Sequence, residues 1–166
     1  VSGSMGGALS TKSELNRLGA AAALAILARE QAEHAIILAT AGNDCTCVHA
    51  TMELPARRGM ALRDMVMQAA RTLGGGGIFL VQCLTAAQAL IQQPVDRVIV
   101  LTDEQDCDRK LQPTLAKPFG RYNYLINISN EKHGIGYGQP WTAHIDGWSE
   151  RLFDFIHGCE HYEQGN

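Results

Sequence analysis

Apolar side chains recur at helical spacing in four segments of the chain. The first predicted helix begins at a Ser10 or Ser13 cap and ends near Gln31. The other three are a helix whose apolar face runs from Leu62 to Leu73, a helix over Phe79–Gln92, and a C-terminal helix from Asp146 or Ser149 to about His161. Helices therefore account for much of the expected core.

Four shorter segments have the pattern of strands. The aliphatic run His34–Thr40 and the alternating run Cys45–Thr51 are joined by turn residues around Gly42 and Asn43, which predicts an antiparallel hairpin. Arg97–Thr102 and Tyr122–Ile128 lack polar alternation, as is typical of strands buried on both faces by helices. Strands that alternate with helices predict an α/β fold with a doubly wound, mostly parallel sheet flanked by helices.

Composition narrows the class of protein. A length of 166 residues fits a single domain over residues 1–166, and the net charge of -3 argues against non-specific nucleic-acid binding by this chain. The five scattered cysteines fit a reducing cytoplasm, so we expect a cytoplasmic protein. The longest apolar stretch, Leu18–Ala28, is far shorter than the roughly 20 residues of a membrane-spanning helix. No membrane association is expected.

The first residues, Val1–Gly7, have the glycine- and serine-rich composition of a loop, and no strand or helix is predicted before them. We therefore expect an N-terminally truncated domain whose first strand lies upstream of Val1. That strand is expected in the middle of the sheet.

Oxygen ligands for a metal ion gather in two places along the sequence. Ser2 and Ser4 stand two residues apart in a glycine-rich segment, and Asp103 follows a strand that is expected to be buried. Ligands bind at the carboxyl ends of such strands, and hard divalent cations prefer oxygen ligands. We therefore expect Ser2, Ser4 and Asp103 to hold Mg²⁺ or another divalent cation.

The segment Val1–Met5 resembles the end of the Asp-x-Ser-x-Ser motif of von Willebrand factor A domains, and Asp103 matches the last carboxylate of their metal-ion-dependent adhesion site. The leading Asp of the motif would precede Val1. The family's threonine is absent from Gly74–Leu80, so Gly77, or Leu80 under a shifted alignment, takes its place. The resemblance implies a site loop of Gly3, Gly76, Gly77, Thr102 and Glu104, with an acidic group of a protein partner as the last metal ligand.

Further stretches are similar to the A domain of bacterial and phage Ro-type (TROVE) RNA-binding proteins. They are Leu125–Asn127, Gly134–Gly138, Trp141 and His144–Glu150. The resemblance implies a non-catalytic domain that closes an RNA-binding ring, with small non-coding RNA held by a ring domain upstream of this chain.

Two other functions stay open. The domain is purely structural or interacts with proteins without a metal if Ser2, Ser4 and Asp103 only cap helices and close turns. Alternatively, Ser4 acts as the nucleophile of a hydrolase, since the segment around it is similar to a nucleophile elbow and histidines follow Asp103 in the chain. The non-catalytic metal-binding function is the leading expectation.

Overall fold

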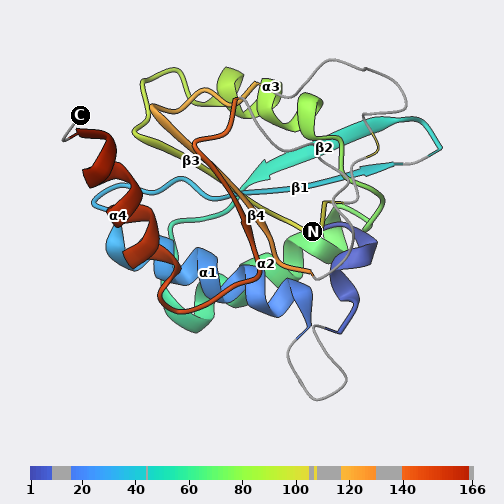
Figure 1. The fold of residues 1–166 in the computed structure, drawn as a ribbon. Coiled ribbons are helices and arrows are strands. Elements are labelled where there is room, and N and C mark those ends of the chain that lie inside the picture. Colours follow the sequence, from blue (N-terminus) through green and yellow to red (C-terminus); the bar gives the residue numbers. More distant parts are fainter. Residues whose placement is uncertain (9–15, 44, 105–106, 108–116, 130–139, 165–166) are drawn as a thin grey trace.

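The structure, a computed structural model, describes residues 1–8, 16–43, 45–104, 107, 117–129 and 140–164 (Figure 1). Its elements in chain order are the 3₁₀ helix η1 (Gly3–Gly6), α1 (Arg17–Gln31), β1 (Leu38–Asn43), β2 (Val48–Glu53), α2 (Gly59–Thr72), α3 (Leu80–Leu90), β3 (Arg97–Thr102), β4 (Tyr122–Asn127), β5 (Ala143–Asp146) and α4 (Leu152–Gln164). No helix within the described ranges is both long and apolar enough to cross a membrane.

The strands form two separate ladders in the described part of the chain. β1 and β2 make an antiparallel pair, whereas β3, β4 and β5 make a parallel sheet in that order. Helices α1, α2 and α4 lie on one side of the strands and α3 lies on the other (Figure 1). The protein is therefore a mixed α/β fold, as the sequence predicts.

Two apolar clusters enclose the parallel sheet. On one face, Leu24 of α1 and Ile156 of α4 pack against Tyr124 and Ile126 of β4. On the other, Leu80 and Leu84 of α3 pack against Leu125 and Trp141. All six residues of β4 are buried, which explains why this strand has no polar alternation.

The first helix begins later than the serine caps predict. It starts at Arg17, and the Asn16 side chain caps it by accepting a hydrogen bond from the Gly19 backbone nitrogen at 2.7 Å. The residues proposed as caps, Ser10 and Ser13, lie outside the described residues. α1 therefore begins at Arg17, directly after Asn16, and not directly after a serine.

The hairpin is confirmed, but its strands lie further along the chain than predicted. The Asn43 side chain accepts hydrogen bonds from the backbone nitrogens of Cys45 (2.9 Å) and Thr46 (3.1 Å), and Cys47 has φ +56°. An asparagine that bonds to the backbone two and three residues ahead fixes the turn after itself. β1 therefore extends to Asn43, and β2 begins after the turn at Val48.

The segment before α4 contains a strand that the sequence analysis missed. Ala143–Asp146 forms β5, and α4 begins at Leu152 rather than at Asp146 or Ser149. A strand of four residues is too short for apolar alternation to be visible in the sequence. Residues 130–139, which precede this segment, lie outside the described residues.

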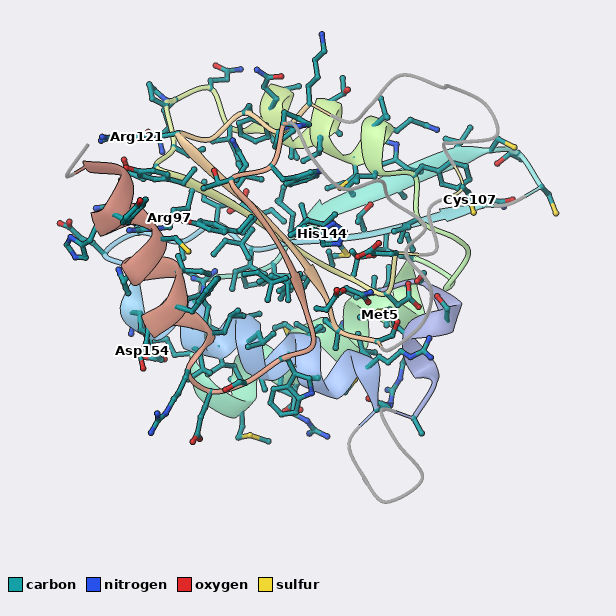
Figure 2. The ribbon with its side chains drawn as sticks, in the orientation of Figure 1. Met5, Arg97, Cys107, Arg121, His144 and Asp154 are labelled. Atoms are coloured by element: carbon teal, nitrogen blue, oxygen red, sulfur yellow. The ribbon has the colours of Figure 1, made fainter. Side chains whose placement is uncertain are left out.

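A charged pair links the start of β3 to α4. The Nε atom of Arg97 donates to Glu160 Oε1 at 2.5 Å, and the hydroxyl of Tyr124 donates to the same oxygen at 3.1 Å; Figure 2 shows Arg97 beside α4. Burial acts to raise the pKa of Glu160, but the hydrogen bond and charge of Arg97 outweigh it and lower that pKa below its usual value. Glu160 thus joins the sheet to α4 as a carboxylate.

This pair makes the stability of the fold depend on pH in acid. A carboxyl with a lowered pKa in the folded state stabilises above its unfolded pKa, near 4.5, and loses that contribution as the pH falls through the folded pKa. We expect Glu160→Gln to be less stable than the wild type at pH 7, with a shallower loss of stability between about pH 5 and 3. Urea unfolding across this pH range measures the free energy of unfolding of both proteins. Glu150→Gln, at an exposed position, is the control. Parallel pH profiles for wild type and Glu160→Gln would contradict the assignment.

Candidate metal site at the carboxyl edge of the parallel sheet

The carboxyl ends of the three parallel strands bring polar side chains together. Thr102 of β3 pairs in register with Asn127 of β4, which in turn pairs with Asp146 of β5. His144 stands two residues before Asp146 and therefore faces the same side of β5. Glu104 follows β3 by two residues. Ligand sites in parallel sheets are found at this edge.

Glu104 adopts an unusual backbone conformation for a residue of its kind. Its φ is +61°, in the left-handed region, and the residue has 0% exposed surface. Its backbone nitrogen donates to Thr102 Oγ1 at 3.0 Å, and its carboxylate Oε1 contacts the ring Nε2 of His144. A non-glycine residue in this region costs on the order of 1–3 kcal/mol, and such residues cluster at functional sites.

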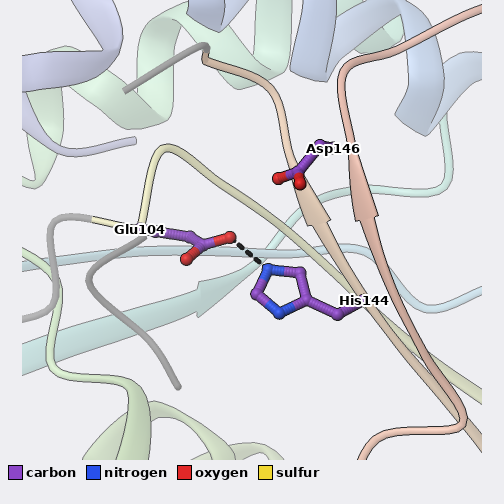
Figure 3. Close-up of side chains that lie close together, drawn as sticks. All are labelled: Glu104, His144 and Asp146. Carbon is purple, nitrogen blue, oxygen red and sulfur yellow. Dashed lines mark hydrogen bonds and ion pairs between the residues drawn. The ribbon is translucent and has the colours of Figure 1, made fainter. Parts of the chain in front are cut away.

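Glu104, His144 and Asp146 form a group of three potential metal ligands (Figure 3). Their nearest ligand atoms all lie within 4.8 Å of one another, close to the limit of about 4.4 Å that two metal–ligand bonds of about 2.2 Å allow. Two carboxylates and a neutral imidazole together carry two negative charges, which a divalent cation would neutralise. This group could hold a metal ion.

Neighbouring amides and hydroxyls hold this group in place. The Asn127 side chain, on a residue that is 1% exposed, donates from Nδ2 to Asp146 Oδ1 at 3.3 Å. Its Oδ1 accepts from the Ser129 backbone nitrogen at 3.0 Å. The Ser129 hydroxyl in turn donates to the Asp103 carbonyl oxygen at 3.5 Å. Hydrogen bonds of this kind orient carboxylates for metal binding.

The residues that the sequence predicts as metal ligands lie beside the group of Glu104, His144 and Asp146. The Oγ atoms of Ser2 and Ser4 are 3.0 Å apart. Asp103 is fully buried, and its Oδ2 accepts from Arg17 Nη1 at 3.4 Å. The same nitrogen donates to the Ser4 carbonyl oxygen at 3.4 Å, so Ser4 and Asp103 converge on one guanidinium group. The cation beside Asp103 is therefore a side chain of the protein itself.

The predicted site loop closes against the hairpin through backbone contacts. The Gly3 nitrogen donates to the Gly76 oxygen at 3.3 Å, and the Gly42 nitrogen donates to the Gly77 oxygen at 2.7 Å. A Cβ atom on Gly76 would lie 1.8 Å from the Gly42 oxygen. Gly77, assigned to the threonine position of the family, uses its backbone oxygen to hold the end of β1. These glycines serve the close packing of three backbone segments.

Three residues of this edge were missed by the sequence analysis as site residues. They are Arg17, His144 and Asp146. The spacing of His144 and Asp146 places both on one face of a strand, but this signal is visible only once the segment is known to be a strand. Arg17 gave no signal, because its contact with Asp103 joins residues 86 positions apart.

Comparison with known proteins finds no match: no family model, no curated protein and no solved structure is significantly similar to the chain. The function of the edge is therefore argued from its own geometry.

The close approach at Gly76 predicts a strong effect of a single methyl group. Gly76→Ala is expected to lower the free energy of unfolding by about 1–3 kcal/mol, because the new Cβ would overlap the Gly42 carbonyl oxygen. Gly6→Ala is the matched control, since no atom lies within 4 Å of its Cβ position. Urea unfolding of both variants measures the difference. Equal stabilities would show that the loop does not close on β1.

Proposed function

We propose that this chain is a non-catalytic domain that binds a divalent cation at the carboxyl edge of its parallel sheet and uses it to engage a partner. The observation that carries the proposal is the group of Glu104, His144 and Asp146, which offers two carboxylates and an imidazole within reach of one ion. Asp146 is exposed, so one side of the ion would face solvent or a partner's ligand. The hydrogen bond from Asn127 to Asp146 supports metal binding, because it orients this carboxylate before an ion arrives.

The donor set favours a particular class of metal. An imidazole with two carboxylates suits divalent transition ions such as Mn²⁺, Fe²⁺ or Zn²⁺ better than Mg²⁺, which prefers an all-oxygen shell. Glu104 Oε1 and His144 Nε2 are in direct contact, so the ion would take the place of the proton they share.

A separate Mg²⁺ site at Ser2, Ser4 and Asp103 stays part of the proposal. Two hydroxyls and a carboxylate are oxygen donors, as Mg²⁺ requires. Arg17 already neutralises Asp103, so Mg²⁺ would have to displace this guanidinium.

At the level of family, we propose a doubly wound von Willebrand A-type domain of a Ro-type RNA-binding protein. Support comes from the parallel order of β3, β4 and β5 with helices on both sides, and from the sequence stretches similar to that family. Small non-coding RNA would then bind to an upstream ring domain. The net charge of -3 fits this proposal, because it disfavours RNA binding by the present chain. The proposed location is the cytoplasm.

A structural role without metal is the second candidate. It is favoured by two internal contacts that give buried carboxylates a partner without any ion, namely Arg17 with Asp103 and His144 with Glu104. The hydrolase alternative has less support, because no histidine in the described residues hydrogen-bonds to Ser4.

A titration with Mn²⁺ tests the proposed site. Mn²⁺ is the probe because the five cysteines of the chain would compete for Zn²⁺. We expect saturable binding of one ion to the wild type, and at least about tenfold weaker binding to Asp146→Asn, which keeps the shape of the side chain but removes its charge. Isothermal calorimetry measures the affinity and the number of ions bound.

The matched control for that titration is Asp154→Asn, which removes the same charge from an exposed position on α4. Its Mn²⁺ affinity should equal that of the wild type. Equal affinities for wild type and Asp146→Asn, or no binding by either, would favour the structural role.

The Mg²⁺ site has its own test. If Arg17 competes with Mg²⁺ for Asp103, Arg17→Gln should bind Mg²⁺ more tightly than the wild type, by about tenfold for a difference of about 1.4 kcal/mol. Asp103→Ala added to Arg17→Gln should abolish that gain. Calorimetry with Mg²⁺ reports both, and circular dichroism shows whether the variants are folded. An unchanged affinity in Arg17→Gln would remove Asp103 from the metal hypothesis.

A further inference from the structure

Arg29, near the end of α1, is a buried cation without a partner among the described residues. The residue is 7% exposed, and its Nε atom is buried without a hydrogen-bond acceptor. None of the ion pairs found in the described ranges involves its guanidinium group. An arginine is seldom buried this deeply unless it is paired, because its charge loses contact with water. Arg29 therefore points to an anion that is not part of the chain.

The position of Arg29 on α1 directs its side chain toward α2. Ala22 and Ile26 of α1 belong to the apolar cluster that also contains Leu62 and Val66 of α2. Arg29 follows Ile26 by three residues and Ala22 by seven, and these spacings place all three side chains on one face of a helix. Arg29 thus continues the face of α1 that packs against α2.

The end of α1 lies beside the beginning of α2. The two helices run side by side (Figure 1), and Nη1 of Arg58, which directly precedes α2, donates to Glu30 Oε2 at 2.5 Å. Glu30 is the neighbour of Arg29 in the last turn of α1. The buried guanidinium group is therefore directed toward the first turn of α2.

That first turn offers backbone donors that no side chain caps. Arg58 occupies the N-cap position without a capping hydrogen bond, and no acidic residue stands in the first turn. The backbone nitrogens of Gly59, Met60 and Ala61 donate to no acceptor in the part of the chain that the structure describes. Met60 is 63% exposed, so the turn is open to solvent. Free amides and the positive end of the helix dipole attract anions.

The loop before α2 adds further positive charge. Arg57 and Arg58 are both exposed. Arg58 is paired with Glu30, whereas no ion pair of the described residues includes Arg57. Arg29 and Arg57 therefore contribute two charges that no carboxylate compensates.

We propose that the first turn of α2, together with Arg29 and Arg57, is a binding site for a phosphate group. The amides of Gly59, Met60 and Ala61 would donate to its oxygens, and the two guanidinium groups would match its two negative charges. A phosphate suits this set of donors better than a carboxylate does, because it has more oxygens and more charge. The proposal does not depend on metal binding, since none of these residues belongs to the candidate metal site.

A titration with inorganic phosphate tests the site, with chloride used to keep the ionic strength constant. We expect the wild type to bind one phosphate and Arg29→Gln to bind it at least about tenfold more weakly, because the charged hydrogen-bond donor is lost. Arg71→Gln removes the same charge at the opposite end of α2 and should keep the affinity of the wild type. Isothermal calorimetry measures the affinities, and circular dichroism shows whether the variants are folded.

A second pair of variants tests the backbone donors at an exposed position. Met60→Glu places a carboxylate in the first turn of α2, where it would repel phosphate and compete for the free amides. We expect its phosphate affinity to fall roughly fivefold or more. Met60→Gln has a side chain of the same shape without the charge and should bind as the wild type does.

The proposal requires weaker binding by both Arg29→Gln and Met60→Glu, with unchanged binding by their two controls. It would be overturned by a wild type that binds no phosphate, or by an Arg29→Gln variant that is folded and binds as tightly as the wild type. O-phosphoserine, titrated in parallel, distinguishes two sources of the group. Tighter binding of inorganic phosphate supports a site for the free ion, and tighter binding of phosphoserine supports a site for a phosphorylated protein.

Discussion

The contact between Glu104 and His144 is the constraint on which the carboxyl edge of the sheet depends. The side chains are 0% and 4% exposed, and they join the end of β3 to β5 across the intervening strand β4. A buried polar group that loses its hydrogen-bond partner costs about 1–3 kcal/mol, so the pair fixes both strands at this edge. It also holds Glu104 in a left-handed conformation that the residue would otherwise leave.

Consecutive residues after β3 turn to opposite partners. Asp103 contacts Arg17 of α1, while Glu104 contacts His144 of β5. In this turn one carboxylate therefore contacts a guanidinium cation, and the other contacts an imidazole, which is itself a metal ligand. This difference is why the proposed transition-metal site lies at Glu104 rather than at Asp103.

The sequence predicted the elements whose pattern is local. The strands around Arg97–Thr102 and Tyr122–Asn127, the hairpin and the helices follow from apolar spacing. The short strand Ala143–Asp146 did not, because four residues carry too little periodicity. In the site, the sequence analysis expected Ser2, Ser4 and Asp103 to lie together. In the structure Ser2 and Ser4 contact each other, and Ser4 and Asp103 both accept hydrogen bonds from Arg17. His144 could not be assigned, since its partner Glu104 lies 40 residues away and only the order of the strands brings them together.

The central claim is that Glu104, His144 and Asp146 ligate a divalent transition metal. Electron spin-echo spectroscopy of the Mn²⁺-loaded chain tests it most directly, because this method detects the nitrogen of a coordinated imidazole. The account predicts a nitrogen coupling in the wild type that disappears in His144→Asn, while the coupling persists when the exposed His34 is replaced in the same way. A spectrum with water protons alone, or a nitrogen coupling that survives in His144→Asn, would contradict it.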